Sequence, residues 1–246
     1  MRYLILSDIH ANREALEAVL REAAGAYDEI WCCGDLVGYG ADPEWVTQWS
    51  IATLGSIVRG NHDKACAGLE DLEWFNPSAR ASALWTQRTL TAGATGYLAK
   101  LPHGPQAVGD AYLVHGSPVD EDEYVIQIRD ATEVAPYLEG PLTFFGHTHV
   151  QGGFLIRRKS AMRISTVQHD QPSAVLQLDA ESTYMVNPGS VGQPRDGDWR
   201  AAYAIYDSVL RTVEYFRIKY AVETAQRKIL AAGLPAPLAH RLALGI

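Results

Sequence analysis

The strongest constraint on the fold of this chain is a junction that recurs five times, in which a short apolar run ends in Asp, Asn or His. At four of these junctions a glycine stands beside the polar residue, and a residue without Cβ lets the backbone turn sharply. The polar residues at the junctions are Asp8, His10, Asp35, Asn61, His62, His115, His147 and His149. In open α/β sheets, functional side chains gather outside the carboxyl ends of the strands. We therefore expect an α/β fold that brings all five junctions to one crevice.

The first third of the chain alternates short apolar runs with amphipathic segments. Predicted strands cover Arg2–Leu6, Glu29–Cys33 and Ile57–Val58, and predicted helices cover 12–25 and Pro43–Leu54. Strands that alternate with helices are typical of a mainly parallel sheet. We expect such a sheet at this end of the molecule.

After Pro105 the apolar runs are short, and turn residues separate most of them. This pattern predicts a second, more antiparallel sheet. Its expected strands are 111–114, 142–145, 154–156, 174–178, 201–206 and 213–218.

Two helical segments accompany the predicted sheets. Residues 64–101 are expected to be helical, with the clearest helix at Pro77–Leu90, and they contain several aromatic residues. These aromatic side chains either belong to the core or form a cap-like insertion that stacks on a flat group of a substrate. A C-terminal helical tail over 220–246 begins with an amphipathic helix at Val222–Ala232. No linker or repeat divides the chain, so we expect a single domain over 1–246.

Charge and cysteine content narrow the class of protein. Lys and Arg total 21 and Asp and Glu total 29, which gives a net charge of −8 and argues against binding to duplex nucleic acid. The three cysteines, Cys32, Cys33 and Cys66, form no CxxC pattern and indicate buried thiols in a reducing compartment. No segment resembles a signal peptide or approaches the roughly 20 apolar residues that span a bilayer. We expect a cytoplasmic protein without membrane contact.

The residue types at the junctions favour metal binding. Any one histidine is more often a hydrogen-bonded core residue, but five of the eight histidines lie at these strand ends. Asp, Asn and His without Cys form an oxygen and nitrogen donor set that suits Mn²⁺, Fe, Zn²⁺, Ni²⁺ or Co²⁺ rather than a structural zinc. Even seven of these eight residues would be too many ligands for one tetrahedral ion, and they suit two ions about 3.5–4 Å apart bridged by a carboxylate.

The motifs DxH, GD, GNHD, HG and GHTH follow one another in this order between Asp8 and His149. The series resembles the calcineurin-like metallophosphoesterases over residues 1–207. The runs SDIHAN, GDLVGYG and NPGSVGQPR are similar to the small prokaryotic phosphodiesterase branch of that superfamily. The resemblance implies a four-layer α-β-β-α sandwich, in which helices flank two facing mixed β-sheets. It also implies a hydrolase of small phosphate esters with two divalent metal ions, of which Mn²⁺ is favoured.

The same resemblance assigns roles to the junction residues. The first metal would be bound by Asp8, His10 and His149, the second by Asn61, His115 and His147, and both by Asp35. A hydroxide that bridges the metals would attack phosphorus, because two cations lower the pKa of a bound water. His62 would lie near the scissile phosphate and, when protonated, supply a proton or a hydrogen bond to the leaving oxygen.

One stretch departs from the phosphoprotein phosphatases of this superfamily, which carry GDxVDRG. Gly38 stands where their second Asp would orient the catalytic histidine, and Tyr39 stands where their Arg would bind phosphate. A protein serine/threonine phosphatase is therefore disfavoured. Arg195 is a candidate for the missing phosphate ligand, and the alternative is a solvated loop arginine. Asp63 adjoins His62 in the sequence, but neighbours in a loop need not touch.

Three functions compete on this evidence. The first is a phosphodiesterase or phosphatase that acts on small, nucleotide-like esters, and the second is a dinucleoside polyphosphate hydrolase. The third is a protein-binding scaffold, since some relatives of this fold lose their metal ligands. All seven ligand positions and His62 are present here, which disfavours the scaffold. The amphipathic tail is compatible with a homodimer or with packing on its own domain.

Overall fold

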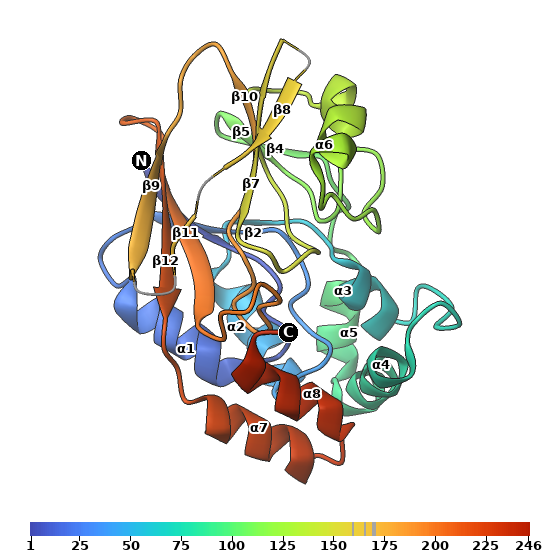
Figure 1. Ribbon diagram of the computed structural model, residues 1–246. Helices are drawn as coiled ribbons and strands as arrows, with labels where there is room; N and C mark the ends of the chain where they lie inside the picture. The colour runs from blue at the N-terminus through green and yellow to red at the C-terminus, as the bar shows by residue number, and fades with distance from the viewer. Residues whose placement is uncertain (159, 165, 169–170) are drawn as a thin grey trace.

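The computed structural model describes residues 1–158, 160–164, 166–168 and 171–246. Within these residues the strands form two six-stranded sheets (Figure 1). The first sheet has the order β3-β2-β1-β11-β12-β9, with β1 (Arg2–Leu6), β2 (Glu29–Cys32), β3 (Ser56–Ile57), β9 (Ser173–Gln177), β11 (Ala201–Asp207) and β12 (Thr212–Ile218). The second has the order β4-β5-β6-β10-β7-β8, with β4 (Gln106–Val108), β5 (Ala111–Leu113), β6 (Leu142–Phe144), β7 (Gly152–Arg157), β8 (Ser160–Arg163) and β10 (Thr183–Asn187).

Helices cover the outer face of each sheet. They are α1 (Arg13–Glu22), α2 (Pro43–Thr53), α3 (Asn61–Cys66), α4 (Pro77–Thr89), α5 (Ala92–Leu98), α6 (Ile128–Val134), α7 (Val222–Ala231) and α8 (Ala236–His240), with short 3₁₀ turns η1 (Ala135–Tyr137) and η2 (Arg241–Leu244). Helix α6 packs on β7 and β8, whereas the other helices lie toward the first sheet (Figure 1). The predicted four-layer sandwich is therefore confirmed. No helix among the described residues is long and apolar enough to cross a membrane.

Strand β1 shows how the layers share one core. Successive side chains of a strand point to opposite faces. Leu4 and Leu6 pack against the helices, whereas Tyr3 and Ile5 pack between the two sheets. The ring of Tyr3 stacks on that of Trp31 with the centroids 3.8 Å apart. Both faces of β1 are buried, which explains why its sequence is a continuous apolar run.

Three predicted strands belong to a different sheet from the one expected. Strand β11 pairs antiparallel with β1, β12 pairs with β11, and β9 pairs with β12, so all three extend the first sheet. The prediction that they complete the second sheet is wrong, and the first sheet is mixed rather than mainly parallel. Local sequence patterns identify a strand, but they do not identify its partner across some 200 residues of chain.

Two further local expectations fail. Strand β10 lies between β6 and β7 in the second sheet, yet the sequence pattern does not predict it. Its last residue, Asn187, is followed by a proline and a glycine. Because these residues are typical of turns, the sequence pattern of a strand is weak here. The expectation of helix throughout 64–101 is wrong for residues 67–76, which lie between α3 and α4 and form no helix. This connecting segment supplies part of a cavity described below.

The buried thiols generate a prediction about stability. Cys32 packs toward the helices and Cys33 packs between the sheets, and burial raises the pKa of both thiols well above the usual range. Cys32→Ala and Cys33→Ala should each lower the free energy of unfolding by about 1 kcal/mol, the scale for one small buried side chain. Urea denaturation of each variant measures this change. Elemental analysis should find wild-type metal content, and a folded variant that lost metal would show that a thiol contributes to the site.

Candidate metal centre

Both sheets contribute to the site, and every contribution comes from a strand end or a helix start. Asp8 and His10 follow β1, Asp35 follows β2, Asn61 and His62 begin α3, His115 follows β5, and His147 and His149 follow β6. All of them are buried except Asn61, which is partly buried. The structure therefore brings the five predicted junctions to one place.

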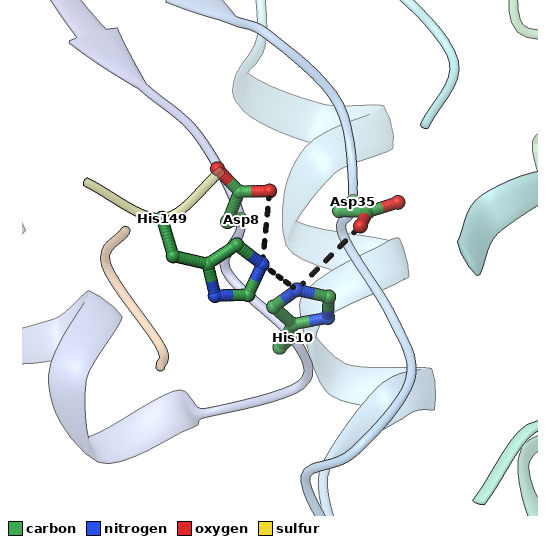
Figure 2. Close-up of side chains that lie close together, drawn as sticks. All are labelled: Asp8, His10, Asp35 and His149. Carbon is green, nitrogen blue, oxygen red and sulfur yellow. Dashed lines mark hydrogen bonds and ion pairs between the residues drawn. The ribbon is translucent and has the colours of Figure 1, made fainter. Parts of the chain in front are cut away.

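Four side chains form the first cluster: Asp8, His10, Asp35 and His149. One nitrogen or oxygen from each lies within 4.8 Å of the others. The Nε2 atom of His10 lies 3.5 Å from Asp35 Oδ2 and 3.0 Å from His149 Nε2 (Figure 2). His149 Nε2 in turn lies 3.4 Å from Asp8 Oδ1. Four donor atoms that converge in this way can hold a metal ion.

Asp35, His115 and His147 form the second cluster, within the same limit of 4.8 Å. His115 Nε2 lies 3.4 Å from Asp35 Oδ2 and 3.2 Å from the side-chain oxygen of Asn61. The same Asp35 oxygen therefore faces His10 in the first cluster and His115 in the second. A carboxylate shared between two clusters can contact two ions at once.

Backbone carbonyl groups fix the orientation of three imidazole rings. In each ring Nδ1 lies at hydrogen-bond distance from a carbonyl oxygen. The pairs are His10 with Val37 at 3.0 Å, His115 with Cys33 at 2.7 Å and His149 with Gln193 at 2.6 Å. When Nδ1 donates its proton to the carbonyl, Nε2 carries the free lone pair that a metal needs. In all three rings Nε2 faces a cluster.

The backbone of the site lies largely in the left-handed region. The φ angles are 53° for Asp8, 48° for His10, 57° for Asp35, 63° for His147 and 58° for His149. Residues that carry a Cβ rarely adopt such angles, and each instance costs on the order of 1–3 kcal/mol. Such residues persist only where their surroundings enforce them, so their concentration at one place indicates a functional site.

Asp63 holds the loop that carries Asp35. Its two carboxylate oxygens accept hydrogen bonds from the backbone N–H groups of Asp35 at 2.9 Å, Leu36 at 2.9 Å and Gly60 at 3.0 Å. Gly60 must lack a side chain, because a Cβ there would lie 2.0 Å from Asp35 Oδ1. Sequence reasoning assigned no role to Asp63. Its place directly after His62 was the one signal that pointed to it.

Burial and mutual charge set the protonation of the metal-free site. Burial lowers the pKa of His10 and His149 well below the usual range and that of His147 to about 3. Burial opposes the charge on His115, but the Asp35 carboxylate raises its pKa to about 10. Burial likewise opposes ionisation of Asp35, yet His115 holds its pKa well below the usual range. His10, His149, His147 and Asp35 are thus in the forms that bind metal near neutral pH, whereas His115 must first lose a proton.

Two buried carboxylate oxygens indicate whether a metal ion fits the site. Asp8 Oδ2 and Asp35 Oδ2 are buried without a hydrogen-bond partner among the described residues. A buried acceptor left in this state costs about 1–3 kcal/mol. A divalent cation would satisfy both atoms, and the surrounding donors are carboxylate, amide and imidazole groups. The residues present therefore fit divalent transition-metal ions.

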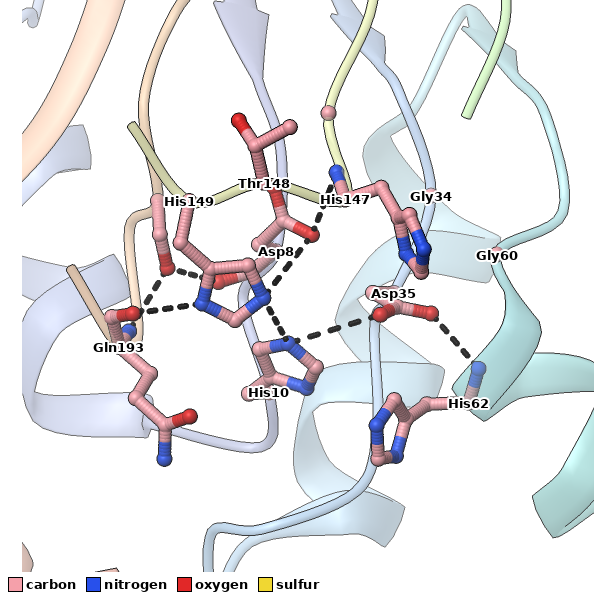
Figure 3. A network of polar contacts seen from close by, with 12 residues as sticks. Asp8, His10, Gly34, Asp35, Gly60, His62, His147, Thr148, His149 and Gln193 are labelled. Atoms are coloured by element: carbon pink, nitrogen blue, oxygen red, sulfur yellow. Dashed lines mark hydrogen bonds and ion pairs between the residues drawn. The ribbon is translucent and has the colours of Figure 1, made fainter. Parts of the chain in front are cut away.

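His62 lies beside the clusters and belongs to neither (Figure 3). Its backbone N–H donates to Asp35 Oδ1 at 2.9 Å. Its ring packs against Tyr39 and Phe75, with centroids 4.3 Å and 5.2 Å away, and a Cβ at Gly38 would lie 2.5 Å from its Nδ1. Aromatic packing thus orients this ring in place of the Asp expected at position 38. Burial lowers the pKa of His62 to about 4.

Arg195 reaches the same side of the site. Its Nη2 donates to the hydroxyl of Tyr39 and to Oε1 of Gln193, both at 3.3 Å. Its backbone N–H donates to the carbonyl of His149 at 3.2 Å. Arg195 is partly buried rather than a solvated loop side chain.

A cavity of about 390 Å³ opens next to the clusters. It is lined by Tyr39, Asn61, His62, Glu70, Asp71, Trp74, Phe75, Asn76, Ala79, Asp122, Tyr124 and His147. Three of these residues are site residues, and four are aromatic. Trp74 is 94% exposed, so its indole can contact a group that enters the cavity.

Several known proteins are similar to this chain in sequence or in fold. Residues 1–209 match the calcineurin-like phosphoesterase superfamily domain. An uncharacterized protein of Methanocaldococcus jannaschii is 33% identical, over 98% of this chain and 97% of its own length. The crystal structure of a metallophosphoesterase from Sphaerobacter thermophilus is 40% identical, with a TM-score of 0.86 over 100% of this chain and 99% of that one. A hypothetical protein from Pyrococcus horikoshii is 18% identical and shares the fold, with a TM-score of 0.77 over 100% of this chain and 98% of its own.

The match covers every junction from Asp8 to His149, and the structure gathers those side chains into buried clusters that fit metal ions. The superfamily is metal-dependent, in agreement with this donor set. The chain belongs to the calcineurin-like phosphoesterase superfamily and is a phosphoesterase hydrolase.

Proposed function

We propose that this hydrolase uses two divalent metal ions to cleave phosphodiester or phosphomonoester bonds of small, nucleotide-like substrates. The observation that carries the proposal is the position of Asp35, whose Oδ2 lies 3.5 Å from His10 Nε2 and 3.4 Å from His115 Nε2. One carboxylate oxygen thus belongs to two groups of donors, which is the arrangement that a pair of bridged ions requires.

The two sets of ligands follow from the clusters. Asp8, His10 and His149 would hold the first ion, Asn61, His115 and His147 the second, and Asp35 both. The ions would supply a deprotonated water as nucleophile and would offset the negative charge of the phosphate. The resemblance to the superfamily favours Mn²⁺, and Fe, Zn²⁺, Ni²⁺ and Co²⁺ are the others to test, because the donor types do not separate these ions.

His62 is the candidate catalytic residue. It lines the cavity, where a leaving group would sit, and it binds neither ion in this assignment. Because burial keeps the ring uncharged near neutral pH, it would act through an N–H of the neutral ring. A hydrogen bond from that N–H would stabilise the negative charge that develops on the leaving oxygen.

The cavity supports a small, flat leaving group. A volume of about 390 Å³ accommodates a group of nucleoside size, and Tyr39, Phe75, Tyr124 and Trp74 offer aromatic faces. We infer that the segment 64–101 acts as a cap-like insertion of a single domain, because it contributes Trp74 and Phe75 to this wall. Substrates of this size fit better than duplex nucleic acid, which the net charge of −8 would also repel.

The function is tested by a panel of metals and substrates. Metal-free protein is reconstituted with Mn²⁺, Ni²⁺, Co²⁺ or Zn²⁺ and assayed on an aryl phosphodiester, an aryl phosphomonoester, cyclic nucleotides and a dinucleoside polyphosphate. We expect metal-dependent hydrolysis with highest activity in Mn²⁺. Absence of hydrolysis on every ester with every metal would contradict the proposal.

The bridging role of Asp35 predicts the effect of Asp35→Asn. The substitution removes a negative charge shared between two cations, so metal content should fall below two equivalents and activity should fall with it. Elemental analysis and aryl ester hydrolysis measure both. Asp28→Asn is the matched control, because Asp28 is exposed, lies outside both clusters and accepts a hydrogen bond from the backbone N–H of Arg2. Two full equivalents with unchanged activity would remove Asp35 from the bridging role.

The charge on His115 predicts that metal binding depends on pH. Asp35 raises the pKa of His115 to about 10 in the metal-free protein, so this ring carries a proton at pH 7. Metal binding must displace that proton, so affinity for the second ion should rise about tenfold for each pH unit from about pH 6 to 8. Calorimetry in buffers of different ionisation enthalpy counts the protons released. Binding that released none would contradict the assignment of His115.

The position of His62 predicts an effect that depends on the leaving group. General acid or hydrogen-bond assistance is worth about 10²–10⁴-fold, and a neutral ring should give a value near the lower end. His62→Ala should keep both metals, lose little kcat/KM on nitrophenyl esters, and lose about 10²-fold on alkyl or nucleoside esters, whose alkoxides leave less readily.

The measurement is kcat/KM across a leaving-group series, with metal content determined in parallel. His103→Ala serves as the control, because His103 is exposed. Equal losses on all leaving groups would indicate substrate positioning, and loss of metal would make His62 a ligand.

A further inference from the structure

Two arginine side chains from distant parts of the chain meet beside the candidate metal centre. Arg195 lies between β10 and β11, and Arg241 begins η2 in the C-terminal tail, beyond the residues that match the superfamily domain. Both guanidinium groups donate to Oε1 of Gln193, at 3.3 Å from Arg195 and 2.5 Å from Arg241. Both also face the ring of Tyr39, with Cζ 5.7 Å and 4.5 Å from its centroid.

Among the described residues, no adjacent carboxylate balances these two charges. Neither arginine forms an ion pair within the part of the chain that the structure describes, and Nε of Arg241 is buried without a hydrogen-bond partner there. Three other arginines with little exposure are paired: Arg59 with Glu121 at 2.8 Å, Arg200 with Asp198 at 2.6 Å, and Arg217 with Asp196. Burial and the charge of Arg195 lower the pKa of Arg241. Two adjacent, unbalanced cations favour the binding of an anion.

The pair borders the site through Tyr39 and Gln193. The ring of Tyr39 lies 4.5 Å from that of His10 and 4.3 Å from that of His62, centroid to centroid. The carbonyl of Gln193 lies 2.6 Å from His149 Nδ1, and its side chain extends away from that ring (Figure 3). The arginines are therefore separated from the candidate metal ligands by a single layer of side chains.

Packing of the tail fixes Arg241 in this position. Leu238 and Ala239 of α8 are fully buried. Lys228 of α7 donates to Glu14 of α1 at 2.8 Å, which ties the tail to the first sheet's helical layer. Arg241 thus projects from a docked element toward the site.

We propose that Arg195 and Arg241 form an anion subsite that binds phosphoryl oxygens of the substrate beside His62. This inference rests on the proposed function and deepens it. Guanidinium groups present several N–H donors in a fixed plane that matches phosphate oxygens. The bound group is either the phosphoryl group under attack or a second phosphoryl group in the leaving part of the substrate.

The test is the binding of inorganic phosphate and inorganic pyrophosphate to the manganese-loaded protein. Calorimetry in excess Mn²⁺ gives Kd, and competitive inhibition of aryl ester hydrolysis gives an independent inhibition constant. Arg241→Met should weaken binding about 10- to 100-fold, the range for one lost charge-assisted hydrogen bond, and Arg241→Lys should recover part of it. Weaker binding of both anions identifies the phosphoryl group under attack, and weaker binding of pyrophosphate alone identifies a second phosphoryl group.

Two control variants separate charge from structure. Arg227→Met removes the same charge from an exposed position on α7, where the side chain donates to Thr224, and should leave both affinities unchanged. Leu238→Ala loosens the tail without changing its charge. It should lower Tm, but at temperatures where the protein is folded it keeps Arg241 and should bind both anions more tightly than Arg241→Met does.

Unchanged affinity for both anions in folded Arg241→Met would overturn the inference, as would equal weakening in Arg227→Met. Failure of the proposed function looks different. In that case the wild-type protein would hydrolyse no ester, while the calorimetric titrations would still show whether the arginines bind the anions.

Discussion

One buried carboxylate joins the two halves of this molecule. Asp35 follows a strand of the first sheet, and its Oδ2 lies 3.4 Å from Nε2 of His115, which follows a strand of the second. An ionised carboxylate without partners is costly in the interior, and here the protonated ring of His115 and the backbone N–H of His62 offset that cost. The sheets cannot shift against each other without breaking this arrangement. The separation of the layers and the geometry of the site are therefore set together.

The site is assembled at the expense of local backbone stability. Left-handed angles at five candidate ligands would each favour another conformation in an isolated peptide. Asp63 counteracts this tendency, because its carboxylate accepts backbone N–H groups from both the loop after β2 and the start of α3. Gly60 allows the two segments to approach, since any side chain there would collide with Asp35. Asp63 and Gly60, which lie outside both clusters of donor atoms, thus help to hold the backbone of the site in place.

The sequence predicts those parts of the architecture that a short run of neighbouring residues specifies. Asp8 and Asp35 stand within three residues of the ends of apolar strands, so the crevice and its polar residues could be predicted, and the structure does bring them together. The pairing of β11 with β1 could not, because it depends on contacts between opposite ends of the chain. The residues that orient His62 could not be predicted from the sequence either. The sequence shows only that Gly38 lacks a carboxylate, whereas the packing of Phe75 on the ring comes from a segment predicted to be helical that forms a loop instead.

The two sides of the site differ in how they are built. The ligand side consists of strand ends in both sheets and is fixed by carbonyl groups and by Asp63, so a change there disturbs the whole arrangement. The opposite side consists of Trp74 from a loop, Tyr124 from another, and Arg241 from the tail. The ring of Tyr124 packs on that of the candidate ligand His147, with centroids 3.8 Å apart, whereas Trp74 and Arg241 lie outside both clusters. Substitution of Trp74 or Arg241 can alter the size, aromatic character or charge of the accepted group while the donor atoms stay in place. We therefore expect the loops and the tail, rather than the motifs that supply the donor atoms, to determine which substrate is accepted.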